Sequence, residues 1–411
     1  MFEVSDPFDL GFDRGRLARI DDFLDKHYVA TGRLKNAQLL VSRNGQPVHY
    51  AHFGKLRDDG TDMREDALFR IASMTKPITS IAFMQLVEQC EIAVDDPVMR
   101  VFPEFADLGV YNGGGGSLPF GPAKHCKPMR FVDLLSHTSG LTYGFQNRSS
   151  IDAAYRKAKL DLARGQITSD DYVRTIASIP LEFEPGSQWN YSVATDVLGI
   201  AVERLTGKML GEYFEENIFA PLGMTDTGFD VSADRADRLA DAYGYRPGKE
   251  PRLIDRATES DFLGKAAFHS GGGGLVSSIA DYNRFCTMLL NKGELDGSRI
   301  VAPKTLDLMT SNHLPGGADL TEMSQSLFSE ANNAGTGFGL GFAMVIDPAK
   351  TLMPASLGEF YWGGAYSTAF FVDPVERITM VFMTQLYPSS TYPIRRQLKT
   401  LIYSALTQSN A

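Results

Sequence analysis

The chain opens with a repeating hydrophobic pattern that is typical of a surface helix. Leu17, Ile20, Leu24 and Tyr28 recur at steps of three or four, with Asp and Arg residues between them. This spacing places the apolar side chains on one face of a helix. We therefore expect an amphipathic helix over residues 14–32.

Strand patterns follow this helix and return near the other end of the chain. Asn44-Gly45 lies between two β-rich runs in NAQLLVSRNGQPVHYAHFG, and this dipeptide favours a two-residue hairpin turn. FYWGG, AYSTAFFVD and RITMVFMTQ read as three short strands, with Asp373-Pro374 starting the turn between the second and the third. A last helical pattern covers about residues 391–408.

The order of these elements predicts an α/β (α+β) fold. Strands lie toward both ends of the chain, whereas the middle is helical in pattern, so the simplest packing joins the terminal strands in one central antiparallel sheet flanked by the N- and C-terminal helices. Residues 1–70 and 245–411 would form this discontinuous sheet domain. Residues 71–244 would form a mostly helical domain, with the active site at the interface of the two.

Composition narrows the class of protein. The 411 residues are 43% hydrophobic and 22% charged, as in ordinary globular enzymes, and the net charge is −10. An acidic chain lacks the basic face that nucleic acid requires. No apolar run approaches the ~18 residues of a membrane helix, and the N-terminal sequence shows no secretory signal, so we expect a cytoplasmic protein without a membrane partner. The cysteines, at positions 90, 126 and 286, are expected to be buried free thiols.

Ser73 and Lys76 are the first candidates for chemistry. They form the chain's only Ser-x-x-Lys, at the start of the long apolar segment FRIASMTKPITSIAFMQLVEQ. Pro77 supports a helix start here, because the first turn of a helix tolerates proline. Both side chains would then share one face, where a desolvated lysine can take the serine proton. The alternative is a capping serine beside a surface lysine.

Other hydrolytic or ligand-binding motifs are missing. The sequence contains no G-x-S-x-G and no H-E-x-x-H, and His49 and His52 would point to opposite faces of a predicted strand. The glycine runs 113–116 and 271–274 lack the Lys-Ser/Thr that follows a phosphate-binding loop. We expect no metal and no cofactor.

Several segments together resemble the serine β-lactamase and penicillin-binding-protein superfamily, most closely its class C-like family VIII carboxylesterases. The matching strings are SMTK at 73–76, LLSHTSGL at 134–141, FEPGSQWNYSVATDVLG at 183–199, SGGGGLVSSIADYNRF at 270–285 and WGGAYSTAFFVDP at 362–374. They follow the family's order and span most of the chain. The resemblance implies a β-lactamase-like fold.

The resemblance also implies roles for individual residues. Tyr191 corresponds to the family's catalytic tyrosine, which together with Lys76 would take the proton of Ser73 and later protonate the leaving group. The backbone N–H groups of Ser73 and Ala365 correspond to the two donors of the oxyanion hole.

Two departures from the β-lactamases bear on the substrate. Val193 stands where Tyr-x-Asn has its asparagine, and Trp362 stands where the third motif has its lysine. Both changes remove groups that bind a β-lactam or its carboxylate. Val193, Trp362, Gly363 and Gly364 are therefore the predicted substrate-binding residues, and an uncharged ester is the favoured substrate.

The sequence thus predicts a serine carboxylesterase that hydrolyses short-chain, uncharged esters through an acyl-enzyme, with weak β-lactam turnover compatible with the same residues. Three alternatives stay open at this point. They are a β-lactamase or D-amino-acid peptidase, an acyltransferase, and a non-enzymatic binding protein with an inactive site. The sequence indicates a small-molecule ester as partner and leaves the oligomeric state undetermined.

Overall fold

A seven-stranded antiparallel sheet organises the fold. The computed structural model describes residues 3–116, 118–161, 164, 167–324 and 333–410. In the sheet the strands run in the order β11-β12-β13-β14-β15-β1-β2. They are β11 (Thr336–Phe338), β12 (Ala343–Val345), β13 (Phe360–Gly363), β14 (Ala369–Asp373), β15 (Ile378–Thr384), β1 (Asn36–Arg43) and β2 (Gln46–Gly54). The mixed α/β fold with an antiparallel sheet is the one that the sequence predicts.

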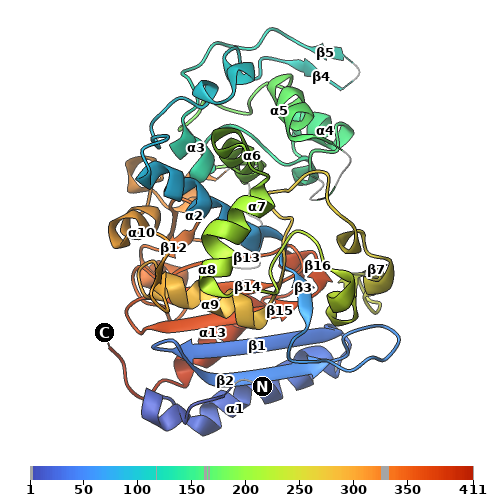
Figure 1. Ribbon diagram of the computed structural model, residues 1–411, viewed down its shortest axis with the longest axis vertical. Helices are drawn as coiled ribbons and strands as arrows, with labels where there is room; N and C mark the ends of the chain where they lie inside the picture. The colour runs from blue at the N-terminus through green and yellow to red at the C-terminus, as the bar shows by residue number, and fades with distance from the viewer. Residues whose placement is uncertain (1–2, 117, 162–163, 165–166, 325–332, 411) are drawn as a thin grey trace.

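The N-terminal hairpin joins the C-terminal strands as expected. β1 pairs with β15, so segments more than 300 residues apart lie side by side in the middle of the sheet (Figure 1). Asn44 and Gly45 both have positive φ, 55° and 79°, as a two-residue hairpin turn with right-handed strand twist requires. Every residue of β1 is buried, because both faces of the sheet are covered.

Two helices cover the outer face of the sheet. They are α1 (Arg14–Leu24) and α13 (Ile394–Ser404), which pack on each other and on the sheet. Leu17, Ile20 and Leu24 are buried there against alternate residues of β1, such as Leu39. The predicted first helix departs from α geometry after Leu24, because residues 25–29 form a π-helical turn that ends it earlier than the predicted residue 32.

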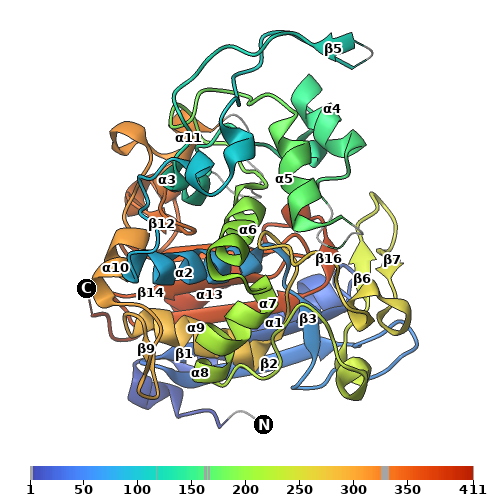
Figure 2. The same cartoon turned by 45° about the horizontal axis from the view of Figure 1, so that its top comes forward.

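The other face of the sheet carries the remaining helices. α9 (Ile279–Leu290) lies directly on β14 and β15, and α2 (Thr75–Glu88) packs against α6 (Ala194–Thr206) farther out (Figures 1 and 2). The other α-helices are α3 (Phe131–Leu135), α4 (Ser150–Lys157), α5 (Ser169–Ala177), α7 (Leu210–Phe214), α8 (Ala220–Leu222), α10 (Pro303–Met309), α11 (Leu320–Met323) and α12 (Pro348–Thr351). One continuous apolar core joins this layer to the sheet.

Short strand pairs complete the fold. They are β3 (Leu68–Arg70) with β8 (Val276–Ser278), β4 (Gly114–Gly115) with β5 (Leu118–Phe120), β9 (Glu294–Leu295) with β10 (Ser298–Arg299), and β6 (Ala242–Gly244) between β7 (Arg252–Asp255) and β16 (Leu386–Tyr387). Segments this short carry no readable alternation, so the sequence pattern does not reveal them. The division into units at residues 70/71 and 244/245 stays a prediction.

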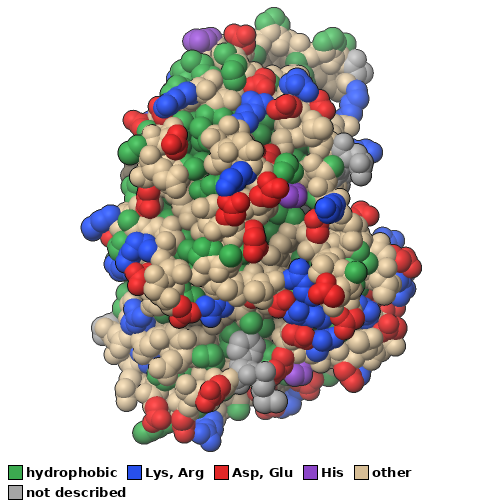
Figure 3. Space-filling view, in the orientation of Figure 1, with side chains coloured by type: hydrophobic (Ala, Val, Ile, Leu, Met, Phe, Trp, Pro, Cys, Tyr) green, Lys and Arg blue, Asp and Glu red, His purple; other side chains and the backbone are tan. Residues whose placement is uncertain are grey.

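The surface has mixed charge. Figure 3 shows acidic and basic side chains interspersed over the face in view, most densely beside β6 and β7. Arg64, for example, bonds to both Asp66 and Asp237. Among the described residues no helix is long and apolar enough to cross a bilayer. The expected cytoplasmic location stays a prediction. Cys90, Cys126 and Cys286 are free thiols, and Cys286 is buried as expected. The expectation of burial is wrong for Cys90, which is exposed just beyond the end of α2.

The buried carboxyl group of Asp281 on α9 makes the stability of the fold depend on pH. Its carboxyl group accepts hydrogen bonds from Asp226 N–H and Thr227 Oγ, at 2.7 and 2.9 Å, and burial raises its pKa to about 6. A pKa raised on folding means that the native state binds the proton more tightly than the unfolded chain. The protonated Asp281 carboxyl group therefore contributes its full share to the stability of the fold below about pH 4, and this share is lost as the pH rises through about 6.

We accordingly predict that Asp281→Asn, which cannot ionise, gains stability relative to wild type as the pH rises from about 4.5 to 7.5, by about 2 kcal/mol. Thermal unfolding of both proteins across this range measures the difference. A difference in melting temperature that does not change with pH would contradict the assignment.

Candidate active site

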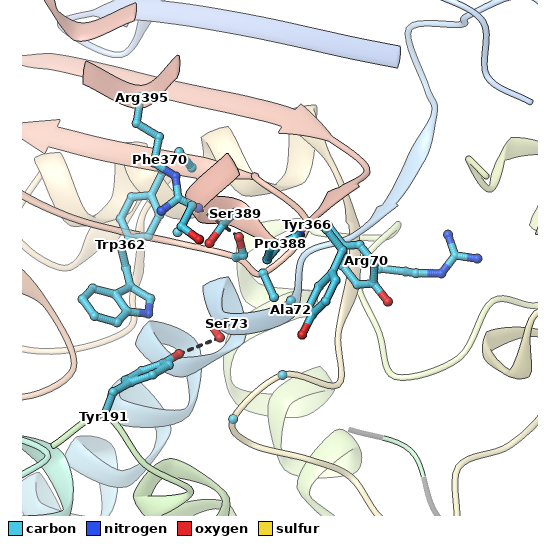
Figure 4. A pocket seen from close by; sticks show the side chains of 18 of the residues that line it. Arg70, Ala72, Ser73, Tyr191, Trp362, Tyr366, Phe370, Pro388, Ser389 and Arg395 are labelled. Carbon is cyan, nitrogen blue, oxygen red and sulfur yellow. Dashed lines mark hydrogen bonds between the residues drawn. The ribbon is translucent and has the colours of Figure 1, made fainter. Parts of the chain in front are cut away.

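Ser73 lies in a tight turn at the start of the central helix. Residues Ala72–Met74 form a 3₁₀ turn, and α2 begins at Thr75. Ala72 has a positive φ of 44°, which is uncommon for a residue with a side chain and marks a strained approach to the serine. The expected order of serine, helix start and Pro77 therefore holds, with Ser73 just before the α-helix. Figure 4 shows Ser73 in the centre of the pocket.

The Lys76 ammonium is buried and fully hydrogen-bonded. Its Nζ donates to Ser73 Oγ at 3.2 Å, to Tyr143 Oη at 3.0 Å and to the Gly272 carbonyl at 2.6 Å. The side chain is only 2% exposed, so these bonds replace the water that a lysine normally has. Two of the three acceptors are hydroxyl groups, which can turn to donate if Nζ loses a proton.

Tyr191 meets Ser73 from the other side. Tyr191 Oη and Ser73 Oγ share a hydrogen bond of 2.6 Å (Figure 4). Lys76 Nζ lies 4.7 Å from the centre of the Tyr191 ring. His137 packs against the same ring and bonds through Nδ1 to Ser192 Oγ at 3.1 Å. Burial, with the nearby charge of Lys76, holds the pKa of His137 well below its usual range. His137 is thus a neutral support for the tyrosine.

The glycine run 271–274 contacts the Lys76 ammonium group through a backbone carbonyl. The Gly272 carbonyl accepts from Lys76, and the Gly272 N–H donates to Asp196 at 3.0 Å. A Cβ on Gly272 would lie 2.4 Å from the Asp196 carboxylate, so only glycine fits there. Burial raises the pKa of Asp196, and the charge of Lys76 opposes that rise. This loop belongs to the matched string at 270–285, but the sequence alone did not indicate that it contacts the lysine.

The end of β13 closes the site opposite the helix. A Cβ on Gly364 would lie 2.3 Å from the Ile71 carbonyl, so this glycine lets the strand reach the Ser73 turn. Ala365 follows it and lines the same cavity as Ser73. Within the described part of the chain, the Ala365 N–H has no hydrogen-bond partner. It is therefore available for an oxyanion.

The predicted substrate-binding residues divide into two groups. Trp362, Gly363 and Gly364 line the cavity, and the Trp362 ring packs 5.4 Å from that of Tyr191. Val193 is completely buried at the start of α6 and is not among the cavity residues, because its short apolar side chain points into the core. Tyr143 is one of the site residues that sequence reasoning missed. It follows the matched string LLSHTSGL, but a single tyrosine after it gives no signal of contact with Lys76.

The cavity measures about 1030 Å³. Ser73, Tyr143, Tyr191, Trp362 and Ala365 are among the residues that line it. This space suits a small organic molecule rather than a polymer. No group of three or more His, Cys, Asp or Glu side chains within the described residues is arranged to hold a metal ion.

Comparison with known proteins identifies the family. The model of the β-lactamase family matches residues 22–403. Esterase EstB from Burkholderia gladioli is 33% identical over 97% of this chain and 98% of its own. The solved structure of EstCE1, a hydrolase with promiscuous acyltransferase activity, superimposes with a TM-score of 0.77 at 27% identity, covering 96% of this chain and 99% of that one.

A third similarity concerns the fold alone. Simvastatin synthase (LovD) from Aspergillus terreus has a TM-score of 0.80 at 23% identity, covering 96% of this chain and 99% of that one. Its sheet and helices agree with those described above. With the match to EstB along nearly the whole chain, these findings confirm the resemblance seen in the sequence. The chain belongs to the β-lactamase family, in the branch of the family VIII carboxylesterases.

Proposed function

We propose that the protein hydrolyses short, uncharged carboxylic esters, with Ser73 as the nucleophile. The observation that carries this proposal is the convergence of Lys76 Nζ and Tyr191 Oη on Ser73 Oγ, at 3.2 and 2.6 Å. A serine is a weak nucleophile until a neighbouring base takes its proton, and here two candidate bases contact it. The esterase relative supports an ester as the substrate class.

The reaction proceeds in two acyl-transfer steps. Ser73 Oγ attacks the ester carbonyl carbon while its proton passes to the pair formed by Tyr191 and Lys76. The N–H groups of Ser73 and Ala365 stabilise the resulting oxyanion. The bond to the alcohol oxygen then breaks, and the alcohol leaves with a proton from Tyr191. Water attacks the acyl-enzyme in the same way and releases the acid.

The hydrogen bonds around Lys76 suit this proton traffic. The Gly272 carbonyl only accepts and therefore fixes one N–H of the lysine in either protonation state. Burial raises the pKa of Tyr143 well above its usual range, so Tyr143 keeps its proton. Its hydroxyl can accept from an ammonium or donate to an amine. The site can thus hold Lys76 in both forms without leaving a buried group unpaired.

Charge in the cavity favours a neutral substrate. Each basic side chain among the described lining residues already has a partner within the protein. Arg70 bonds to Asp255, Arg164 to Asp230, Lys399 to Glu359, Arg395 to backbone carbonyls of Gly364 and Thr368, and Arg396 to the Leu352 carbonyl. A substrate carboxylate would therefore enter a site whose cations are already engaged.

Transfer to an acceptor other than water is a second candidate function. The same acyl-enzyme can react with any alcohol that reaches it, and the related EstCE1 combines hydrolysis with acyl transfer. The products formed with and without an added alcohol separate the two reactions.

The first prediction concerns the nucleophile. A phosphonate or sulfonyl fluoride should label one peptide, the one containing Ser73, and Ser73→Ala should lose both labelling and ester hydrolysis. Mass spectrometry of the digested protein locates the label. Stoichiometric labelling elsewhere, together with an active Ser73→Ala protein, would rule out this mechanism.

The second prediction concerns the proton relay. Lys76→Ala and Tyr191→Phe should each lower kcat on a p-nitrophenyl ester by about 10²–10⁴-fold. Because the two groups act as one unit, the double variant should be scarcely slower than either single variant. Steady-state kinetics of the three proteins tests this. Losses that multiply would show independent roles, and near-normal activity of Tyr191→Phe would remove the tyrosine from the relay.

The third prediction concerns selectivity. The wild type should prefer a two-to-four-carbon p-nitrophenyl ester to a cephalosporin. Trp362→Lys should improve turnover of the carboxylate-bearing cephalosporin relative to the ester by about ten- to a hundredfold, because it restores a charge-assisted hydrogen bond. The ratio of kcat/KM values in both proteins is the measurement. Equal efficiency of the wild type on the two substrates would refute the argument from the missing lysine.

A further inference from the structure

A tight turn between β13 and β14 carries Ala365. This turn, residues 364–368, is closed by two backbone bonds, from Gly364 N–H to the Thr368 carbonyl at 2.9 Å and from Ser367 N–H to the Gly364 carbonyl at 3.0 Å. The Gly364 carbonyl and the Ala365 N–H belong to the same peptide unit. Anything that holds that carbonyl also orients the proposed oxyanion donor.

Arg395 holds this carbonyl from behind. Its Nη2 donates to both the Gly364 and the Thr368 carbonyls, each at 2.9 Å, and so bridges the two ends of the turn. The arginine is the second residue of α13, on the outer face of the sheet, and in Figure 4 it comes from the side of the site opposite Tyr191. A Cβ on Gly363 would lie 2.6 Å from Arg395 Cζ, so this glycine makes room for the guanidinium.

We propose that Arg395 is a positioning residue that aligns and polarises the Gly364–Ala365 peptide as an oxyanion donor. A charged donor on a peptide carbonyl draws electron density from the amide nitrogen, and hydrogen bonds in such chains strengthen each other. The Ala365 N–H therefore becomes both a stronger donor and a more fixed one. Preorganised donors of this kind lower the energy of the transition state more than that of the bound substrate.

Other contacts keep the turn folded without Arg395. Tyr366 accepts a backbone bond from Leu386 N–H at 3.0 Å, and Ser367 Oγ donates to the Leu386 carbonyl at 2.7 Å. Thr368 Oγ also reaches the Ile71 carbonyl, at 3.4 Å. Loss of the guanidinium should therefore change the orientation and polarity of one peptide, and leave the strands in place.

The inference rests on the proposed esterase function, and the test compares Arg395→Ala and Arg395→Lys with a control. Arg395→Ala should lower kcat on a p-nitrophenyl ester by about ten- to a hundredfold, somewhat less than complete removal of an oxyanion donor. KM should change by less than about threefold, because the bond matters mainly in the transition state. Arg395→Lys should recover part of kcat, since an ammonium can reach a carbonyl but lacks the planar fork.

Arg16→Ala is the matched control. Arg16 also donates from a guanidinium to a carbonyl of α13, that of Ser404 at 3.0 Å, far from the site. This variant should keep its kcat. Guanidinium chloride at a non-denaturing concentration should restore activity to Arg395→Ala and have no such effect on Arg16→Ala.

A trifluoromethyl ketone separates positioning from packing. It forms a charged tetrahedral adduct with the serine. Its inhibition constant should therefore rise in Arg395→Ala by the same factor by which kcat/KM falls. An unchanged kcat and an unchanged inhibition constant, with only a lower melting temperature, would overturn the proposal and leave Arg395 as a packing residue. If the proposed esterase mechanism itself were wrong, the Ser73→Ala variant would still hydrolyse the ester at the wild-type rate. That result distinguishes failure of the mechanism from failure of the proposal for Arg395.

Discussion

The proposed active site depends on the buried ammonium group of Lys76, with which no carboxylate of the described residues forms an ion pair. Transfer of such a charge from water costs several kcal/mol unless its donors are satisfied. Lys76 meets this condition with three acceptors, Ser73, Tyr143 and Gly272, which come from three separate segments of the chain. The helix, the segment after α3 and the glycine loop must therefore all be in place before the lysine can be buried. Fold and site are coupled through this one group.

The glycines near the site follow from the same constraint. Gly272 leaves space for Asp196 behind the lysine, and Gly364 lets a strand end approach the Ser73 turn. In both places the backbone supplies the useful group, a carbonyl for Lys76 and an N–H of the next residue for an oxyanion. Backbone groups are well suited to this purpose because hydrogen bonds within the loop and the turn hold them in place, so little reorganisation accompanies the reaction.

The two layers of the protein contribute differently to the proposed chemistry. The helical layer brings the proposed proton-transfer groups, since Lys76 lies on α2 and Tyr191 lies three residues before the start of α6. The sheet brings the Ala365 peptide and the Trp362 ring. Arg395 connects the site to the outer face of the sheet, because it links α13, which covers that face, to the turn at the end of β13. Substrate selectivity can then change through residues at the end of β13 while the proton relay stays the same.

The sequence by itself determined the elements whose periodicity or turn chemistry is strong. Apolar spacing defined α1, and Asn44-Gly45 defined the first hairpin, because these signals act over a few neighbouring residues. The Ser-x-x-Lys spacing also belongs to one helical turn, so Ser73 and Lys76 could be paired before any fold was known. The matched motifs added Tyr191, Trp362 and Ala365 as members of the same site.

Only the tertiary structure decided what lies around these residues. Tyr143, Gly272 and Arg395 meet the site from other parts of the chain, and no local pattern encodes contacts between residues 27 to 196 positions apart. Val193 shows the reverse case, a motif position that packing places in the core. The three-residue strands β11 and β12 were likewise invisible, because so short a run has no period of its own and forms only where the neighbouring strand offers its hydrogen bonds.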